Sequence, residues 1–414
     1  MTRSILVIGA GIVGVCCALS LQKRGLAVTL IDRGSPGRET SYGNAGVLSR
    51  ISITPINNPG LYGKIPSYLG NKHAALHLNW GRVAKSPEWL LRFLWEARSS
   101  QAQQRIEALN SLTATTVEMH RDLMAQAGIS RHLRDNGTIK LWRGEAGHAA
   151  AKADHDFLKS RGIETEILDR QGISAYEPHL NPIFVAGLYV PANGSVDNPA
   201  AVVEGYAALF AARGGTILRG EVTALSRSGS RWQAVTTSGS HETDAIVLAL
   251  GPWSGDLLRP LGLDPKLDVE RGYHFHMRPK GGTTLSRPVY DVDAAYFMAP
   301  MEQGLRVTSG VEIAHRDAPE NHRQVNAALA SAREAITAGE TVEDKPWRGS
   351  RPTLPDSLPM IGEAPRHPGL WLAFGNQHIG LTTGPATGEV LAAMMTGERP
   401  MADPKPFAPS RYIR

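Results

Sequence analysis

The chain has 414 residues, a formal net charge of +5 and an ordinary globular composition, with 42% hydrophobic and 20% charged residues. Its length exceeds one typical hydrophobic core and predicts two or three domains. No apolar run approaches the roughly 18 residues that a membrane-spanning helix needs, and no basic run interleaved with aromatic residues points to nucleic acid.

Residues 4–33 carry the strongest pattern in the sequence. Ser4–Ile8 is a continuous apolar run, typical of a parallel strand that is buried on both faces. Directly after it come three glycines in G-x-G-x-x-G spacing, Gly9, Gly11 and Gly14. This spacing predicts a tight turn, a close approach of the backbone to a pyrophosphate, and close helix–strand packing. Leu26–Ile31 is the expected second strand, and Asp32 at its end can accept hydrogen bonds from ribose hydroxyls. We interpret the unit as a site for an adenine dinucleotide; the alternative is a glycine-rich turn in an unrelated α/β protein.

The start of the chain also bears on the compartment. The cysteines, Cys16 and Cys17, are adjacent, so they can form neither a disulfide framework nor a metal site. The apolar N-terminal run belongs to the nucleotide unit and lacks a cleavage site, so it is not interpreted as a signal peptide. A charge of +5 could assist docking to an anionic membrane face, with a solvated surface as the alternative. We expect a cytoplasmic protein, at most peripheral on the inner face of the membrane.

Further elements typical of the same α/β sheet occur much later in the chain. A short strand is predicted at Gly215–Arg219, and buried strands that end at glycines are predicted at Asp244–Leu250 and Leu370–Phe374. Helices are expected at Pro199–Arg213 and Pro385–Met395, and alternation at Val222–Thr237 predicts a small antiparallel meander. Strands of this kind build a ligand crevice at their carboxyl ends.

The intervening segments have a different character. Residues 49–80 are rich in Pro, Gly, Asn and Tyr and are expected to be irregular. Helical periodicity marks Pro87–Ala97 and Ile106–Ala127. Residues 268–278 and 288–313 combine aromatic and β-branched residues between turn glycines and predict strands of a mixed or antiparallel sheet.

The predicted fold is therefore an α/β, two-domain architecture with a discontinuous Rossmann-like domain. We assign residues 1–60, 185–262 and 345–414 to the nucleotide-binding domain. The inserted residues 61–184 and 263–344 are assigned to a substrate domain built on a mixed or antiparallel sheet.

The loop Thr40–Gly46 lies just beyond the nucleotide-binding unit. Its small residues and backbone amides would let the chain lie against a flat ring system and phosphates. A plain surface loop is the alternative, but the position after the βαβ unit favours cofactor contact.

Several motifs recur together across nearly the full length. They are VIGAGIVG (7–14), ETSYGNAGVL (39–48), GLYVPANGSVDNPAAV (187–202), LALGPWS (248–254), ERGYH (270–274), RPTLPDSLPMIG (351–362) and GNQHIGLTTGPATG (375–388). In this order they resemble the D-amino-acid oxidase superfamily of FAD-dependent oxidoreductases, most closely its D-amino-acid dehydrogenase small-subunit group. The ERGYH form departs from the commoner versions of that segment, which bears on substrate identity.

The resemblance implies FAD rather than NAD, and no cysteine lies downstream to attach it covalently. A helix N-terminus after 375–384 would stabilise negative charge on the reduced flavin ring, with Thr382 and Thr383 as expected caps; an ordinary capped helix is the alternative. The residues expected to bind FAD are Gly9, Ala10, Gly11, Ile12, Val13, Gly14, Asp32, Arg33, Thr40, Ser41, Asn44, Ala45, Gly46, Val47, Val222, Gly251, Trp253, Gly375, Gly380, Leu381 and Thr382.

Three residues are candidates for the substrate site. Arg351 precedes a proline, which favours extended backbone, and its guanidinium offers a bidentate fork suited to a carboxylate. By resemblance it grips the substrate carboxylate; the alternative is a salt bridge. Tyr273 resembles tyrosines that contact substrate in the family, against a packed core tyrosine. His378, between cofactor glycines, is a candidate above the flavin, against a structural histidine.

Other residues are weaker candidates. Tyr290, Tyr296 and Arg316 are expected at most in the pocket wall. His274 and His276 could suggest a metal, but no acid or cysteine completes a site, so no metal is expected.

The function implied is FAD-dependent dehydrogenation of an amino acid, with hydride passing from Cα to flavin N5 and no obligatory side-chain base. The resemblance suggests a D-amino acid or a cyclic D-imino acid such as D-proline or hydroxy-D-proline, with a quinone or respiratory-chain component as the electron acceptor. The alternatives are an oxygen-using glycine- or sarcosine-type amine oxidase and a non-catalytic flavoprotein module; an NAD-linked dehydrogenase is least favoured.

Overall fold

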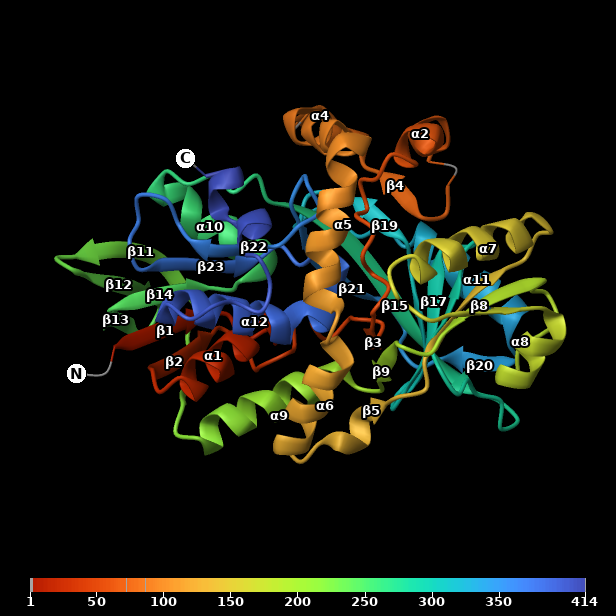
Figure 1. The fold of residues 1–414 in the computed structure, drawn as a ribbon, viewed down its shortest axis with the longest axis horizontal. Helices are drawn as coiled ribbons and strands as arrows, with labels where there is room; N and C mark the ends of the chain where they lie inside the picture. The colour runs from red at the N-terminus through yellow and green to blue at the C-terminus, as the bar shows by residue number, and fades with distance from the viewer. Residues whose placement is uncertain (1–2, 72, 86, 414) are drawn as a thin grey trace.

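The computed structural model describes residues 3–71, 73–85 and 87–413. Figure 1 shows two β-sheet assemblies side by side, with helix α5 (Ser99–Thr113) running between them. Both ends of the chain lie on the side of the smaller sheet assembly. The architecture is the mixed α/β, two-part fold that the sequence predicts.

The first assembly is the predicted α/β sheet. Its described strands run in the order β10-β2-β1-β14-β23-β22, and all pairs are parallel except β22–β23. The strands are β1 (Ser4–Ile8), β2 (Ala27–Asp32), β10 (Thr216–Arg219), β14 (Ala245–Leu248), β22 (Met360–Glu363) and β23 (Leu370–Phe374). Because the parallel strands are in register, their carboxyl ends meet at one edge of the sheet. The predicted strands at both ends of the sequence are confirmed.

Helices α1 (Ile12–Lys23), α9 (Pro199–Ala212) and α12 (Gly380–Thr396) pack together beside this sheet. Helix α9 begins as its sequence predicts, with Pro199 in its first turn and the Asn198 side chain accepting a hydrogen bond from Ala201 N at 3.0 Å. The strands β11 (Val222–Ser228), β12 (Arg231–Thr236) and β13 (Gly239–Thr243) form the expected meander, extended by one strand.

The second assembly is a large mixed sheet. Its described path is β4-β19-β15-β18-β17-β16-β6-β8-β7, with β20 and β21 also pairing with β15. The strands are β4 (Leu76–Leu78), β6 (Thr138–Trp142), β7 (Glu166–Leu168), β8 (Ala186–Val190), β15 (Asp268–Pro279), β16 (Val289–Asp291), β17 (Tyr296–Met301), β18 (Gly304–Thr308), β19 (Val311–Ile313), β20 (Ala338–Thr341) and β21 (Trp347–Thr353). Helices α7 (Ala146–Lys159), α8 (Arg170–Tyr176) and α11 (Arg323–Ala335) pack on it. A third, small sheet has the order β3-β9-β5 and joins β3 (Val47–Leu48), β9 (Gly194–Val196) and β5 (Leu133–Arg134).

Two strands lie outside the domain to which their residues were assigned. Strand β8 pairs with β6 and β7, and β21 pairs with β15 over seven residue pairs, so both belong to the large sheet. The predicted boundaries at 185 and 345 ignore these pairings, which join segments far apart in sequence. The remaining division of the chain into two domains stays a prediction.

Several helix predictions need correction. The segment 49–80 is not irregular throughout, because it contains α2 (Leu61–Leu69) and β4 and ends at the start of α3 (Trp80–Lys85). The single helix expected over Ile106–Ala127 is two helices, α5 (Ser99–Thr113) and α6 (Thr116–Gln126). Helix α4 (Pro87–Glu96) lies where expected, while α12 begins five residues before Pro385. Among the described residues, no helix has the length and apolar character to span a bilayer.

The contact between α1 and α12 depends on the absence of side chains. A Cβ atom at Gly388 would lie 2.6 Å from the Cys16 carbonyl oxygen, and one at Gly384 would lie 2.9 Å from Ile12 Cγ1. Both helices are almost fully buried at this crossing, and the two buried cysteines lie there as small apolar residues. The glycines therefore set the distance between the two helices.

Gly388→Ala is expected to destabilise the protein by about 1–3 kcal/mol, because overpacking against backbone outweighs the better helix propensity of alanine. The apparent Tm, measured by differential scanning calorimetry, should fall by a few degrees. Gly144→Ala is the matched control, since a Cβ atom at this exposed residue meets nothing within 4 Å. An unchanged Tm for Gly388→Ala would show that the helices can separate freely.

Candidate active site

A single cavity of about 900 Å³ extends from the carboxyl edge of the six-stranded sheet to the large sheet and the α2–α4 segment. Its lining includes most of the predicted cofactor residues together with Arg351 and His378. The predicted cofactor residues that do not line it are Ala10, Gly14 and Gly46. The structure thus gathers segments from both ends of the sequence around one space.

The three glycines after β1 have three distinct surroundings. A Cβ atom at Gly9, which has φ +111°, would lie 2.5 Å from the Ala249 carbonyl oxygen. A Cβ atom at Gly14 would overlap the Gly9 carbonyl oxygen. At Gly11 the nearest atom would be Ser41 Oγ at 3.4 Å, and this residue faces the cavity. The turn, the packing contact and the open approach to a ligand therefore fall on Gly9, Gly14 and Gly11, as the spacing predicts.

Asp32 at the end of β2 closes the same turn. Its Oδ2 accepts a hydrogen bond from Ala10 N at 2.7 Å, and its Oδ1 accepts one from Gly34 N at 2.8 Å. Asp32 also lines the cavity. A carboxylate has about four acceptor sites, so these two bonds leave capacity for ribose hydroxyls.

The predicted cofactor loop Thr40–Gly46 joins both sheet assemblies. Ser41 Oγ accepts a hydrogen bond from Ile12 N at 3.1 Å, at the start of α1. Thr40 Oγ1 donates to the Ser350 carbonyl on β21 at 2.9 Å, and Asn44 Nδ2 donates to the His378 carbonyl at 3.2 Å. The loop is therefore held against the nucleotide turn, as cofactor contact requires.

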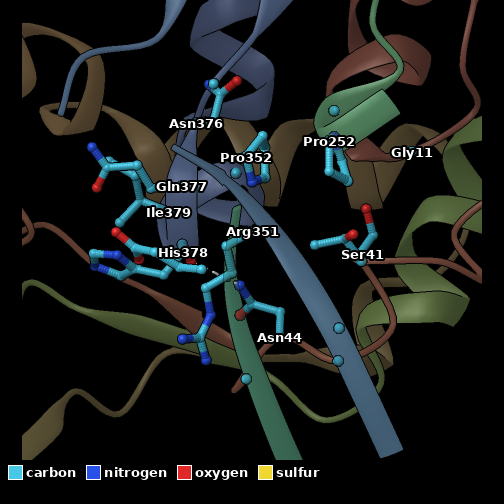
Figure 2. Close-up of a pocket in the computed structure, with 18 of the residues that line it drawn as sticks. Gly11, Ser41, Asn44, Pro252, Arg351, Pro352, Asn376, Gln377, His378 and Ile379 are labelled. Atoms are coloured by element: carbon cyan, nitrogen blue, oxygen red, sulfur yellow. Dashed lines mark hydrogen bonds between the residues drawn. The ribbon is translucent and has the colours of Figure 1, made fainter. Parts of the chain in front are cut away.

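The segment that leads into α12 forms the opposite wall, as Figure 2 shows for Asn376 to Ile379. Asn376 Nδ2 donates to the hydroxyls of Thr383 and Thr387, each at 3.0 Å. The expectation that Thr382 and Thr383 cap the helix is wrong, because the cap residue is Ile379 and it makes no side-chain capping bond. Instead Thr383 donates to the Ile379 carbonyl at 2.9 Å, and the Thr382 hydroxyl accepts from Ser49 N at 3.1 Å. Both hydroxyls make hydrogen bonds with backbone groups, and neither caps the helix.

Arg351 lies on β21 and points into the cavity (Figure 2). Its partner in the sheet register is Glu270 on β15. A Cβ atom at Gly272 would overlap the Arg351 guanidinium, so the guanidinium lies directly across this glycine. Enclosure in the protein lowers the pKa of Arg351, an effect that the negative charge of Glu270 opposes. Among the described residues, none makes a hydrogen bond to the Arg351 guanidinium.

Glu270 is the counter-charge that the sequence analysis did not single out. Burial raises its pKa to about 7, although the positive charge of the neighbouring Arg351 lowers it. Its Oε2 is buried without a hydrogen-bond partner among the described residues. The spacing of Glu270 and Gly272, two residues apart on a strand, could have indicated that both share one face.

Tyr273 also lines the cavity, although its side chain extends from the face of β15 opposite to Arg351. It alternates with Gly272 on β15, and its hydroxyl donates to Glu312 Oε2 at 2.8 Å. The same hydroxyl accepts from Asn321 N at 3.1 Å and from the Arg271 guanidinium. The residue is 2% exposed and its hydroxyl is held in a buried hydrogen-bond network, so a contact between Tyr273 and substrate stays a prediction.

His378 lies in the cavity wall, and its place above a flavin stays a prediction. Its ring faces the cavity from the segment before α12, near Arg351 (Figure 2). The side chain is exposed within the cavity, and desolvation together with the Arg351 charge lowers its pKa to about 4. The ring is therefore neutral near pH 7.

Of the weaker candidates for the pocket wall, one lines the cavity and two do not. Tyr290 lines the cavity, whereas Tyr296 packs beside Arg143, and Arg316 is bonded to Asp256 at 2.7 Å. Trp253 lines the cavity and stacks under the Arg33 guanidinium, 4.5 Å from its ring centre.

The prediction that no acid completes a site with His274 and His276 is wrong, because the fold brings a distant acid beside them. Glu343, distant in sequence, lies with His274 and His276 so that their potential ligand atoms are within 4.8 Å of one another. Its carboxylate binds His276 Nδ1, while Arg306 Nε donates to His276 Nε2 at 3.0 Å. A buried guanidinium in this contact opposes a cation, so the cluster is better described as a buried ion-pair network.

Comparisons with known proteins agree with this geometry. Residues 4–394 match the family described as FAD dependent oxidoreductase. A D-amino-acid oxidase from Bradyrhizobium diazoefficiens is 32% identical over 99% of both chains, and a D-amino acid dehydrogenase from Agrobacterium fabrum is 33% identical over 99% of both. Among solved structures, glycine oxidase from Geobacillus kaustophilus has a TM-score of 0.77 at 23% identity and covers 100% of both chains. That last likeness shows the fold alone.

Gly11→Val is expected to remove bound FAD without preventing folding, because the new side chain enters the cavity and meets little protein. Gly14→Val is the matched comparison, since its side chain would overlap backbone and should destabilise the fold itself. Flavin absorbance per protein and Tm, measured for both variants, separate the two effects. A Gly11→Val protein with stoichiometric FAD would show that the pyrophosphate does not lie at this turn.

Proposed function

The chain belongs to the family of FAD-dependent oxidoreductases, and from this premise we propose that it oxidises an amino acid at Cα. The proposed substrate is a D-amino acid or a cyclic D-imino acid, and the proposed attachment of FAD is non-covalent. Arg351, His378 and the FAD-contacting residues named above are the proposed site. Relatives of similar length named D-amino acid dehydrogenase and D-amino-acid oxidase support this proposal.

One observation supports the proposal most strongly. An arginine without a hydrogen-bond partner among the described residues faces the same cavity as the nucleotide turn. A guanidinium in an enclosed site presents a rigid fork to an anion, and a carboxylate matches it in a bidentate geometry. An amino acid held by its carboxylate on Arg351 would lie between the large sheet and the cofactor loop.

In the proposed reaction, FAD supplies the hydride acceptor. Arg351 binds the substrate carboxylate and thereby orients the Cα–H bond, which is the main contribution of a positioning residue. His378 lines the same cavity, so its ring would lie near a substrate bound at Arg351. The backbone amides at the start of α12 would stabilise negative charge on the reduced cofactor ring.

The proposed electron acceptor is a quinone or another respiratory-chain component, which the relatives named dehydrogenases support. The relative named D-amino-acid oxidase supports oxygen as the second candidate. Anaerobic bleaching of the flavin by a panel of D- and L-amino acids tests the substrate class, and reoxidation by oxygen against a soluble quinone then separates the acceptors. An FAD-loaded protein that no amino acid reduces would contradict the proposal.

Arg351→Ala is expected to bind FAD but to lose about two to four orders of magnitude in kcat/KM for anaerobic flavin reduction. The estimate follows from the roughly 3–5 kcal/mol that an unpaired buried charge costs. Arg351→Lys should recover only part of the loss, because an ammonium is a point charge without the fork. If the alanine variant remained within about threefold of the parent protein, Arg351 would be structural.

The Glu270 carboxyl predicts a pH dependence. When ionised it competes with a bound carboxylate for Arg351 and repels it, so binding should favour the protonated form. The affinity for an amine-free carboxylate such as 4-methylpentanoate is therefore expected to fall as the pH rises through about 7, by up to tenfold per pH unit. Titrations monitored by flavin absorbance measure this dependence. Glu270→Gln should abolish it, and an unchanged pH profile in that variant would assign the titration to another group.

A further inference from the structure

The part of the cavity next to Arg351 is lined by aliphatic side chains from two neighbouring strands. Antiparallel pairing places Ile313 opposite Glu270, and β4 continues the sheet with Leu78 beside Ile313 and Leu76 beside Val311. Residues paired across strands share a face. The four aliphatic side chains of β19 and β4 therefore lie on the face of the sheet that carries Arg351, and all four line the cavity.

Helices α2 and α4 add to the same compartment. The cavity lining from these helices is Leu61, Tyr68, Trp89, Leu90 and Phe93. Trp89 and Phe93 are stacked with ring centroids 5.1 Å apart, and Leu61 and Phe93 belong to one buried cluster. Figure 1 shows both helices along the upper edge of the molecule, with α4 above α5 and α2 above β4.

Arg351 and Glu270 adjoin this compartment, with Glu270 opposite Ile313 in the sheet register, and the other charged lining residues lie elsewhere. Those at the nucleotide end are Asp32, Arg33, Glu39, Glu221 and Asp256, and Lys140 is paired with Asp154. Of the described lining residues contributed by α2, β4, α4 and β19, none carries a formal charge. A charged substrate side chain placed there would lose water without gaining a partner, which is costly.

We propose that this compartment binds the side chain of the substrate, and that the substrate class is amino acids with aliphatic or aromatic side chains of leucine size or larger. The inference rests on the proposed function, because it takes Arg351 as the carboxylate anchor. With the carboxylate on Arg351, the adjoining apolar floor of β19 and β4 receives the side chain. Each methylene group buried there should improve binding about fourfold.

The test compares kcat/KM for anaerobic flavin reduction of the FAD-loaded protein. D-Leucine, D-methionine and D-phenylalanine are expected to exceed D-alanine, D-proline, D-glutamate and D-arginine by at least tenfold. Equal or higher values for D-proline or for the charged amino acids would overturn the inference.

A matched pair of variants tests the location. Leu90 lines the cavity, whereas the next residue, Leu91, is 66% exposed on the outside of α4. Leu90→Trp should lower kcat/KM for D-phenylalanine at least tenfold more than for D-alanine, and Leu91→Trp should change neither. If both variants behaved alike, the side chain would lie elsewhere.

Binding of amine-free carboxylates separates this inference from the proposed function. 4-Methylpentanoate should bind the FAD-loaded protein at least tenfold more tightly than glutarate, whether or not any amino acid is oxidised. Tight binding without turnover would overturn the proposed reaction and support the apolar compartment. Turnover without a preference for 4-methylpentanoate would support the proposed reaction and overturn the apolar compartment.

A second feature concerns the helix that leads from the cavity. Pro385 lies inside α12, so it has no N–H group for the Leu381 carbonyl, its normal partner four residues earlier. That carbonyl instead lies 2.8 Å from His120 Nε2 on α6. Because a carbonyl only accepts, Nε2 carries the hydrogen and Nδ1 accepts from the Tyr206 hydroxyl, also at 2.8 Å. His120 and Tyr206 are both completely buried.

Helix α6 makes a second bond to the same turn, since Thr116 Oγ1 donates to the Thr382 carbonyl at 2.6 Å. Leu381 and Thr382 both line the cavity. We infer that His120 is a positioning residue that replaces the missing Pro385 N–H and so fixes the first turn of α12 against FAD. This inference also rests on the proposed cofactor site.

His120→Leu is expected to weaken FAD binding at least fivefold and to lower the midpoint potential of the bound flavin, because the turn that faces the reduced ring is no longer held. Met124→Ala is the control on the same helix, since it removes a fully buried side chain without touching α12 carbonyls and should not shift the potential. An unchanged potential and FAD affinity in His120→Leu would overturn the inference.

The double variant His120→Leu/Pro385→Ala is the sharpest test. Alanine restores a backbone N–H that can bond the Leu381 carbonyl, so most of the lost affinity and potential should return. In a double-mutant cycle the two changes should be strongly non-additive. Additive effects on Tm, a measurement that does not require bound flavin, would show that the histidine and the proline are not coupled.

Discussion

Close approach of backbone to backbone, at places where no side chain fits, determines where the parts of this molecule can lie. The Gly9 turn lies against Ala249, Gly14 lies against Gly9, and Gly388 brings α12 onto α1. These contacts draw the first and last segments of the sequence together at the carboxyl edge of one sheet. The cavity exists because that edge is lined by backbone and small residues.

At the wall of the cavity formed by the large sheet, the absence of a side chain also determines where charged groups lie. The absence of a side chain at Gly272 lets the Arg351 guanidinium lie flat across β15, beside Glu270. In an enclosed space each of these charges is poorly solvated, so each is sensitive to any anion that enters. Electrostatic selectivity for a carboxylate therefore follows from a steric detail of the strand.

The sequence predicted best those features that are encoded within one short segment. The turn of Gly9, Gly11 and Gly14 with Asp32 follows from spacing alone, and the buried strands of the first sheet follow from apolar runs. Features that depend on pairing between distant segments were missed. The face of β15 occupied by Tyr273 is set by the registers of β19 and β21, and the approach of Glu343 to His276 joins elements far apart in sequence. The predicted start of α12 at Pro385 was too late, because a proline usually marks the beginning of a helix. In the structure Pro385 lies inside α12, and α6 supplies the hydrogen bond to the Leu381 carbonyl that the proline cannot make.

The packing of α12 on α1 also has a consequence for how the chain folds. These helices come from opposite ends of the sequence, and β23 pairs directly with β14 beside β1. During synthesis, the apolar surfaces of β1 and α1 emerge long before the strand and helix that cover them. Such high contact order slows folding and prolongs the exposure of aggregation-prone surface. We therefore expect nascent chains to depend on chaperones until α12 has been made, and C-terminally shortened chains to aggregate.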